Sequence, residues 1–191
     1  MNKIILASGS PRRKQLLELA EIPFEVIVSE SDESYPETLS AAEIAMHIAE
    51  NKAIAVQEKL KIQHSSNGQT IIAADTVVVL ENKIIGKPKD REEAIQILSN
   101  LSGKTHYVIT GVCILRDSEK KLFAEKTEVD FNPLSLSQIE YYIDHFKPYD
   151  KAGAYAIQEW IGAIGIASIK GDFYNVMGLP INKLVKELSA Q

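Results

Sequence analysis

An aspartate lies inside the most apolar run of the sequence, the stretch TIIAADTVVVL at residues 70–80. Asp75 has apolar neighbours on both alternating faces of the strand that this run predicts. Burying an unpaired carboxylate costs several kcal/mol, so such a residue normally meets a cation, a metal ion or strong hydrogen-bond donors. The structural alternative is a strand end at which Asp75 caps local amides. We favour a functional role because the uncharged run is long, whereas Thr76 alone indicates nothing, since threonine is common in strands.

Lys52 is a second charged residue that breaks an apolar pattern. Ser40 and Glu43 form a capping-box pair, which predicts a helix that begins there and runs to about Gln63. At helical spacing this segment has an apolar stripe made of Ala45, Ile48, Ala49, Ala53, Val56 and Leu60. Lys52 falls on the same stripe. Its side chain can extend along the apolar surface to solvent or place a positive charge opposite Asp75, and both alternatives stay open.

The stretch LASGSPRRKQLL at residues 6–17 joins a predicted strand, residues 3–7, to a predicted helix. Arg12 and Arg13 stand in the first turn of that helix, where the helix dipole disfavours cations. Backbone N–H groups and small residues such as Ser8 at a helix start form an anion-binding arrangement, and Pro11 at the first helical position loses no needed donor. Arginine donates bidentate hydrogen bonds suited to phosphate. The stretch therefore predicts a phosphate site, although it is neither a P-loop nor a dinucleotide-binding fingerprint.

An acidic loop follows the strand predicted at residues 23–29. Its carboxylates are Glu30, Asp32 and Glu33. Loops after strands of α/β sheets commonly bind ligands, and hard oxygen donors beside a phosphate suit Mg²⁺ or Mn²⁺. For any single member, a solvated surface carboxylate is the simpler interpretation. Lys87, between glycine and proline in the sequence GKP, is on its own typical of a surface turn.

Length and composition limit the classes of function. The chain has 191 residues, of which 45% are apolar and 25% charged, the profile of a globular protein with its own core. A net charge of −5 gives no positive field for nucleic acid or an anionic membrane. No apolar stretch has the length of a transmembrane helix, and the N-terminus lacks the longer apolar region of a signal peptide. Cys113 is the only cysteine and the histidines are scattered, so we expect neither a disulfide nor a cysteine or histidine metal site, and we expect a cytoplasmic location.

The order of predicted elements indicates a mixed-sheet α/β protein. Strands and helices alternate in the first half, and two long strands dominate the middle. Further predicted strands cover residues 84–85, 103–115 and 122–131, with a charged turn at 116–121. Further predicted helices are one capped by Asp90 over residues 91–101, one capped by Ser137 and Glu140 that ends at His145, and a final one near Pro180. No repeat or linker divides the chain, so one domain over residues 1–191 is expected.

Seven motifs, taken in order, resemble those of the Maf family. They are LASGSPRRKQLL, Lys52-Ala53, AADTVV, GKP, LSGKTHYVITGV, DKAGAYAIQ and VMGLP, and together they cover essentially the whole chain. Any one motif is weak, whereas the ordered set is highly specific. The resemblance implies an α/β fold related to the inosine triphosphate pyrophosphatases, with a mixed twisted sheet, flanking helices and two lobes around a central cleft.

The resemblance also implies an activity and a substrate class. Members hydrolyse the α–β phosphoanhydride of nucleoside triphosphates, with a divalent metal ion such as Mg²⁺ or Mn²⁺, to the nucleoside monophosphate and pyrophosphate. Asp75-Thr76 and the intact DKAGAYAIQ motif at residues 150–158 match the type that acts on dTTP and UTP. A sister group that prefers 7-methyl-GTP has Asp-Gln in the central strand. A homodimer is also implied.

Carried over by position, the resemblance assigns roles to single residues. Asp75 is the proton acceptor, and the specificity residues are Arg12, Thr76 and Gln158. Polar positions of the family's cleft are matched by Glu33, Lys52 and Lys87. We hypothesise that Asp75 and Glu33 hold the metal ion, and which of the two is the base stays open. The residues assigned to the triphosphate are Ser8, Arg13, Lys52 and Lys87, while Arg12 reaches either phosphate or base.

Two positions depart from the family, and two other functions stay open. Glu159-Trp160 follow Gln158 where many members have glycine, which leaves the geometry beside Gln158 open, and Ala74 replaces a common glycine. One alternative is a nucleotide-binding regulator of septum formation that acts through protein contacts with little catalysis. Carboxylates beside the phosphate site disfavour it. The other is an enzyme of the same chemistry that acts on modified nucleotides such as 5-methyl-UTP or pseudo-UTP.

Overall fold

A computed structural model describes residues 4–62 and 68–189, so the predicted ends at Lys3 and Gln63 fall outside the described residues. The chain forms two compact units. Unit 1 comprises residues 1–75, 110–125 and 178–191, and unit 2 comprises residues 76–109 and 126–177. In the described ranges, no helix is long and apolar enough to cross a membrane. The single domain over residues 1–191 stays a prediction.

The strands and helices follow the predicted alternation. The strands are β1 (Ile4–Leu6), β2 (Phe24–Val26), β3 (Thr70–Leu80), β4 (Lys83–Ile85), β5 (Thr105–Arg116), β6 (Glu119–Phe131) and β7 (Ile166–Lys170). The helices are α1 (Pro11–Leu19), α2 (Ala41–Ile62), α3 (Arg91–Leu101), α4 (Leu136–Phe146), the 3-10 helix η1 (Ala152–Ala154), α5 (Trp160–Gly165), α6 (Phe173–Met177) and α7 (Ile181–Ser189).

The described residues form a seven-stranded mixed sheet flanked by helices, which confirms the predicted fold class. Hydrogen-bonded neighbours follow the order β2-β1-β3-β5-β6-β7, and β4 pairs with β3 off this path. Strand β1 pairs in parallel with β2 and β3, whereas β4 and β7 run antiparallel to β3 and β6. Strands β3, β5 and β6 contribute residues to both units.

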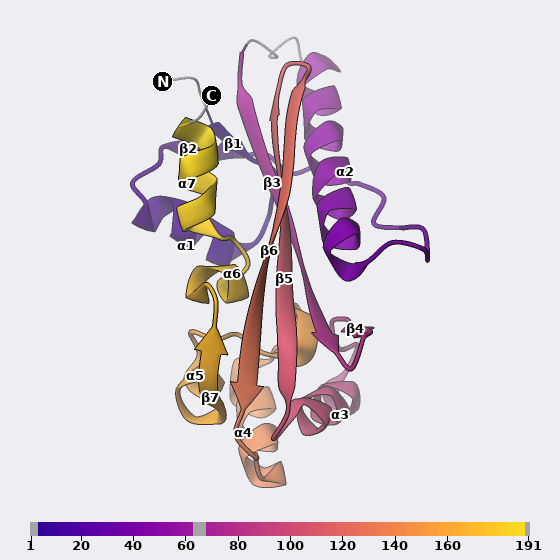
Figure 1. Cartoon of the computed structure of the whole chain (residues 1–191), viewed down its shortest axis with the longest axis vertical. Helices are drawn as coiled ribbons and strands as arrows, with labels where there is room; N and C mark the ends of the chain where they lie inside the picture. Colours follow the sequence, from indigo (N-terminus) through magenta and orange to yellow (C-terminus); the bar gives the residue numbers. More distant parts are fainter. Residues whose placement is uncertain (1–3, 63–67, 190–191) are drawn as a thin grey trace. The chain divides into compact units, whose positions relative to one another are not determined.

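In unit 1, the two faces of β3 contact different helices. Figure 1 shows α2 on one side of β3, with α1 and α7 on the opposite side. Ile71 and Ala73 pack in one cluster with Ala53 and Val56 of α2. Because side chains alternate along a strand, Asp75 belongs to the same face as Ile71 and Ala73. The alternation of side chains along β3 and the apolar stripe of α2 together therefore direct the side chain of Asp75 towards α2.

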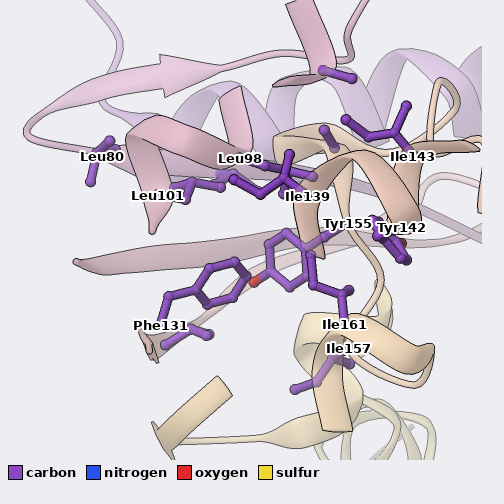
Figure 2. Close-up of a cluster of buried hydrophobic side chains, with 14 of the residues drawn as sticks. Leu80, Leu98, Leu101, Phe131, Ile139, Tyr142, Ile143, Tyr155, Ile157 and Ile161 are labelled. Atoms are coloured by element: carbon purple, nitrogen blue, oxygen red, sulfur yellow. The ribbon is translucent and has the colours of Figure 1, made fainter. Parts of the chain in front are cut away.

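Unit 2 has a core of its own, drawn in Figure 2. It joins the second half of β3 to α3, α4, β6 and residues 154–161, with Leu98, Leu101, Ile139, Ile143 and Ile161 almost fully buried. His106 is also fully buried, and its Nε2 lies 2.8 Å from the hydroxyl of Tyr155. The rings of His106, Tyr155 and Phe131 meet edge to face.

Several predicted boundaries are confirmed and others are wrong. Asp90 caps α3 by accepting a 2.8 Å hydrogen bond from the amide of Glu93, as predicted. The predicted cap of α4 by Ser137 and Glu140 is wrong, because Ser135 and Gln138 form the reciprocal capping box two residues earlier. Strand β2 is shorter than residues 23–29, and the β5–β6 turn is shorter than 116–121. The sequence patterns did not predict η1, α5, β7 and α6.

Candidate active site

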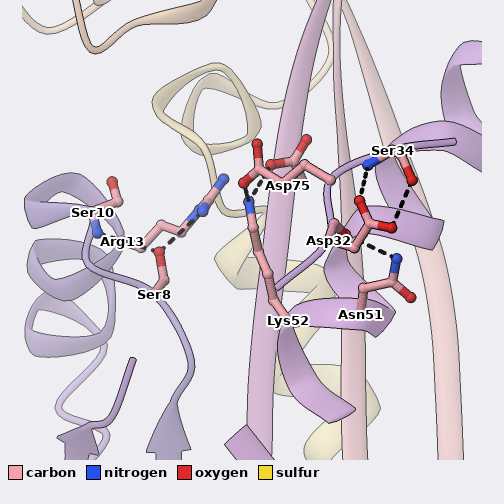
Figure 3. A network of polar contacts seen from close by, with 9 residues as sticks. Ser8, Ser10, Arg13, Asp32, Ser34, Asn51, Lys52 and Asp75 are labelled. Carbon is pink, nitrogen blue, oxygen red and sulfur yellow. Dashed lines mark hydrogen bonds and ion pairs between the residues drawn. The ribbon is translucent and has the colours of Figure 1, made fainter. Parts of the chain in front are cut away.

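Asp75, Lys52 and Glu33 form an ion-pair cluster in unit 1, shown in Figure 3. Lys52 reaches across from α2, and its Nζ lies 2.7 Å from Oδ1 of Asp75 and 2.8 Å from Oε1 of Glu33. The side chains of Lys52 and Asp75 are 19% and 17% exposed, whereas that of Glu33 is 57% exposed. Lys52 therefore does not extend to solvent: its ammonium group pairs with a largely buried carboxylate and with a surface one.

The loop that carries Glu33 is held against α2 by its neighbours. The carboxylate of Asp32 accepts hydrogen bonds from the amide and the hydroxyl of Ser34, at 2.8 and 2.7 Å. These two bonds keep the pKa of Asp32 below its usual value. Asn51 of α2 donates from Nδ2 to the carbonyl of Asp32 at 3.1 Å, which fixes the loop beside Lys52 (Figure 3). Asp32 thus shapes the loop, while Glu33 meets the cation.

Arg13 is buried at the start of α1 and is held from two directions. Its Nε donates to the carbonyl of Gly178 at 2.8 Å, and Nη1 donates to Oγ of Ser8 at 3.1 Å. Burial lowers the pKa of Arg13, and the negative charges of Asp75 and Glu33 act in the opposite direction. Figure 3 shows the guanidinium of Arg13 extending towards Asp75. Two cations from two helices are thus directed towards the Asp75 carboxylate in unit 1.

The first turn of α1 carries two arginines and no acidic residue of its own. Pro11 occupies the predicted first helical position, and Ser10 is the N-cap residue, but its side chain accepts no hydrogen bond from the turn. Instead the amide of Ser10 donates to Oγ of Ser8 at 3.3 Å. The first turn contains no acidic residue, and Arg12 is half-buried there. A helix N-terminus with this composition attracts an anion through its backbone dipole and its cations.

The other predicted site residues lie in unit 2. Thr76 directly follows Asp75 on β3 and is half-buried, whereas Lys87 and Gln158 are exposed. The segment of Lys87 contacts the DKAGAYAIQ segment, because the amide of Gly153 donates to the carbonyl of Gly86 at 3.1 Å. Gly153 has a φ of 71°, and a Cβ there would lie 3.0 Å from the side chain of Val78, so glycine is required at this contact.

Gln158 stands at a hollow in the surface of unit 2. This hollow has a volume of about 350 Å³ and is lined by Gln158, Glu159, Ser168 and apolar residues that include Phe173. A side-chain amide offers both a donor and an acceptor, so Gln158 can hydrogen-bond to a heterocyclic edge. The site residues thus fall into two groups: Ser8, Arg12, Arg13, Glu33, Lys52 and Asp75 in unit 1, and Thr76, Lys87 and Gln158 in unit 2.

Comparison with known proteins identifies the family. The sequence matches the family described as Maf-like protein over residues 3–191. This chain belongs to the Maf family. It is 48% identical over 187 residues to a dTTP/UTP pyrophosphatase of Bacteroides fragilis strain YCH46, which covers 97% of this chain and 94% of that protein. It is 50% identical over 185 residues to a dTTP/UTP pyrophosphatase of Cytophaga hutchinsonii, covering 97% and 82% of the two proteins.

The Maf fold of this chain also has a solved structural relative. The Ham1 protein of Staphylococcus aureus superimposes with a TM-score of 0.56 and covers 99% of each chain, at 20% sequence identity. At this identity the likeness concerns the fold alone. It agrees with the mixed sheet and flanking helices described above.

Sequence analysis did not identify two residues that contact the candidate site. Asn51 lies beside Lys52 on α2 and donates to the carbonyl of Asp32. Its position next to a candidate lysine was the feature of the sequence that could have identified it. The carbonyl of Gly178 comes from the motif VMGLP, 165 residues from Arg13, and a backbone acceptor leaves no signal in its side chain. Among residues 4–62 and 68–189, no group of three or more histidine, cysteine, aspartate or glutamate side chains converges as a metal site.

Proposed function

We propose that this chain hydrolyses dTTP and UTP to the nucleoside monophosphate and pyrophosphate. The observation that carries the proposal is the single point in unit 1 at which the carboxylates of Asp75 and Glu33 meet the ammonium of Lys52, with Arg13 beside them. A proton acceptor and phosphate-binding cations are thereby present together. The names of the relatives from Bacteroides fragilis and Cytophaga hutchinsonii support the substrate class.

In this proposal the cations bind the triphosphate and Asp75 accepts a proton from the attacking water. Arg13, Lys52 and Lys87, with the hydroxyl of Ser8 and the N-terminus of α1, neutralise the phosphate oxygens. Lys52 already bonds Oδ1 of Asp75, so we assign Oδ2 as the atom that takes the proton. The near-buried position of Asp75 keeps bulk water from competing for that oxygen.

The carboxylates also fit a divalent metal ion. Mg²⁺ is usually bound through one or two carboxylates together with substrate phosphates, and Glu33 and Asp75 direct hard oxygen donors to one point. Glu33 and Asp75 would hold Mg²⁺ or Mn²⁺. When bound, the ion supplies neutralisation of negative charge on the phosphate oxygens.

We assign nucleobase selection to Arg12, Thr76 and Gln158. Thr76 and Gln158 carry hydrogen-bonding groups suited to a pyrimidine edge, and Arg12 provides donors for either a phosphate or a base. The hollow beside Gln158, with Phe173 in its lining, supports this assignment because aromatic and amide groups bind flat heterocycles. A cytoplasmic location and a homodimer stay predictions.

The test of the proposal measures pyrophosphate release from a panel of nucleotides. Canonical and modified nucleoside triphosphates are incubated with the protein and Mg²⁺ or Mn²⁺, and the released pyrophosphate is hydrolysed by inorganic pyrophosphatase and quantified as phosphate. We expect the highest kcat/KM for dTTP and UTP. Higher rates with 5-methyl-UTP or pseudo-UTP would instead indicate an enzyme for modified nucleotides. Tight binding of UTP without any product would indicate the regulatory function.

The substitution Asp75→Asn tests the proton acceptor. Asparagine has nearly the same shape and can still accept a hydrogen bond from Lys52, so the fold should persist. We expect kcat to fall by at least about a hundredfold, the contribution typical of a positioned base. Asp117→Asn, in the exposed β5–β6 turn, is the matched control and should retain full activity. Near-normal pyrophosphate release by Asp75→Asn at saturating metal would show that Asp75 is not the base.

A further inference from the structure

Gln158 is an exposed residue in an otherwise buried segment. From Gly153 to Ile157 each residue is buried, and the chain then turns into α5. The turn is tight: a Cβ at Gly162 would lie 1.7 Å from the carbonyl oxygen of Ile157. The amide of Gly162 also donates to the carbonyl of Glu159 at 2.9 Å. The backbone on both sides of Gln158 is therefore fixed by its surroundings.

The hydroxyl group of Tyr142 contacts residues that lie before and after Gln158 in the sequence. Its ring is fully buried on α4. The hydroxyl accepts a 3.2 Å hydrogen bond from the amide of Ala156 and donates to Oε2 of Glu159. One oxygen atom thus joins the residue two positions before Gln158 to the residue directly after it.

The carboxylate of Glu159 accepts the hydrogen bond from Tyr142 and does not cap α5. It is the N-cap residue of α5, but its side chain makes no capping hydrogen bond. Its Oε1 lies 3.6 Å from Nζ of Lys151, whose side chain is only 9% exposed. Lys151 also pairs with Asp150 at 2.7 Å, and the Asp150 side chain is 58% exposed. A buried ammonium needs a counter-charge, and Glu159 supplies the one shielded from solvent, at 22% exposure.

We propose that Tyr142, Lys151 and Glu159 form a positioning cluster that fixes the orientation of Gln158 and thereby sets nucleobase selectivity. This inference rests on the proposed function, in which Gln158 reads the base. A glutamine amide distinguishes uracil from cytosine only when its oxygen and nitrogen are held in a defined orientation, because the two bases exchange donor for acceptor at the same edge. The three residues of the positioning cluster act through Gln158.

The main variant is Tyr142→Phe, which removes the hydroxyl and keeps the buried ring and its stacking on Phe146. The readout is the ratio of kcat/KM for UTP to that for CTP. It is measured together with the ratio of the Kd of the CTP analogue to the Kd of the UTP analogue, both being non-hydrolysable α,β-methylene compounds. We expect both ratios to fall by about tenfold, the scale of one lost buried hydrogen bond, with little change in kcat for CTP. Tyr141→Phe, the exposed neighbour on α4, is the matched control and should leave both ratios unchanged.

A second variant separates charge from hydrogen bonding. Glu159→Gln keeps an oxygen that accepts from Tyr142 but removes the counter-charge of Lys151. We expect a smaller loss of selectivity, about threefold, in a protein that folds. In the double variant Tyr142→Phe/Gln158→Ala, the ratios should equal those of Gln158→Ala alone, because a residue that acts through Gln158 has no effect without it.

The outcomes separate the positioning cluster from the proposed function. A wild-type protein that binds the UTP analogue selectively but releases no pyrophosphate contradicts the proposed function, while the Kd ratios still test the cluster. Unchanged ratios in Tyr142→Phe, or losses that add to those of Gln158→Ala, overturn the cluster. An equal loss for UTP and CTP also overturns it, because that result indicates a general effect on stability.

Discussion

Arg12 and Arg13 are adjacent in the chain and have different surroundings. Arg13 is buried and is held by the carbonyl of Gly178 and the hydroxyl of Ser8. Arg12 is half-buried in the same first turn of α1. A fixed guanidinium suits the phosphates, which all nucleotides share, whereas the more exposed one suits discrimination among them.

The substitutions Arg12→Ala and Arg13→Ala should therefore differ in kind. For Arg13→Ala we expect weaker binding of every nucleoside triphosphate by a similar factor, and a loss of about 2 kcal/mol in the free energy of unfolding, because two buried acceptors lose their donor. For Arg12→Ala we expect changed ratios of kcat/KM among nucleotides and little change in stability. Calorimetric Kd values for UTP, CTP and GTP and urea unfolding measure these effects. A changed ratio in Arg13→Ala would contradict the division of roles.

At the scale of elements, the site depends on the close packing of α2 on β5. Gly111 of β5 lies directly under α2, and a Cβ there would be 2.3 Å from the carbonyl carbon of Ala45 and from the amide of Met46. The helix that carries Lys52 is therefore seated on a residue without a side chain. A side chain at residue 111 would meet backbone atoms of α2, so α2 would have to move to make room for it.

The substitution Gly111→Ala should displace α2 and affect both stability and turnover. We expect the free energy of unfolding to fall by about 3 kcal/mol, since the methyl group meets backbone and not a flexible side chain. Because Lys52 moves with α2, kcat should fall as well. Gly86→Ala is the control for stability, since a Cβ at Gly86 meets no atom within 4 Å, and it should change the free energy by less than about 0.5 kcal/mol. Equal melting temperatures for the two variants would contradict this account.

Local sequence signals predicted most elements, and they failed where equivalent signals compete. Strand β3 and the Asp90 cap of α3 each have a single strong pattern, and both are confirmed. For α4, the sequence LSLSQIE offers two serines with a polar partner three residues later, and the local pattern does not choose between them. In the structure Ser135, not Ser137, is the N-cap residue. The sequence patterns missed η1, α5 and α6 because these helices are too short to show a period.

At the scale of the whole molecule, the buried residue His106 makes the free energy of unfolding depend on pH. His106 lies near the start of β5 and is fully buried against Phe131 and Tyr155. Burial lowers its pKa to about 4, although the charge of Asp130 acts in the opposite direction. In the unfolded chain the pKa of histidine is about 6.5.

Acid should therefore destabilise the protein in part through His106. Between pH 6.5 and pH 4 the unfolded chain binds a proton that the folded chain excludes, so stability falls as the pH falls. From pH 7 to pH 4.5 this group should remove about 2 kcal/mol from the free energy of unfolding. Urea unfolding of wild type and His106→Gln at the two pH values measures it. The variant should lose less stability on acidification, and equal losses would contradict the assignment to His106.

The candidate site was predictable where charge broke an apolar pattern within one element. Asp75 in a strand and Lys52 on a helical stripe could each be identified, and strand alternation then brings them to one face. Their convergence with Glu33 on one ammonium could not be predicted, because it depends on the loop fixed by Asn51. The buried state of Lys151 could not be predicted either, since its counter-charge stands eight residues later beyond a turn.

The hydrogen bond from Arg13 to Gly178 cannot form in the nascent chain until residue 178 has been synthesised. Unit 1 is assembled from three segments, and its last segment, from residue 178 onward, leaves the ribosome after all of unit 2 has been made. Until then the guanidinium of Arg13 lacks its backbone acceptor and α7 is missing from the sheet face. A nascent chain that stops early therefore carries Asp75 and Lys52 but lacks the acceptor that holds Arg13. The proposed phosphate site is thus complete only after translation has passed Gly178.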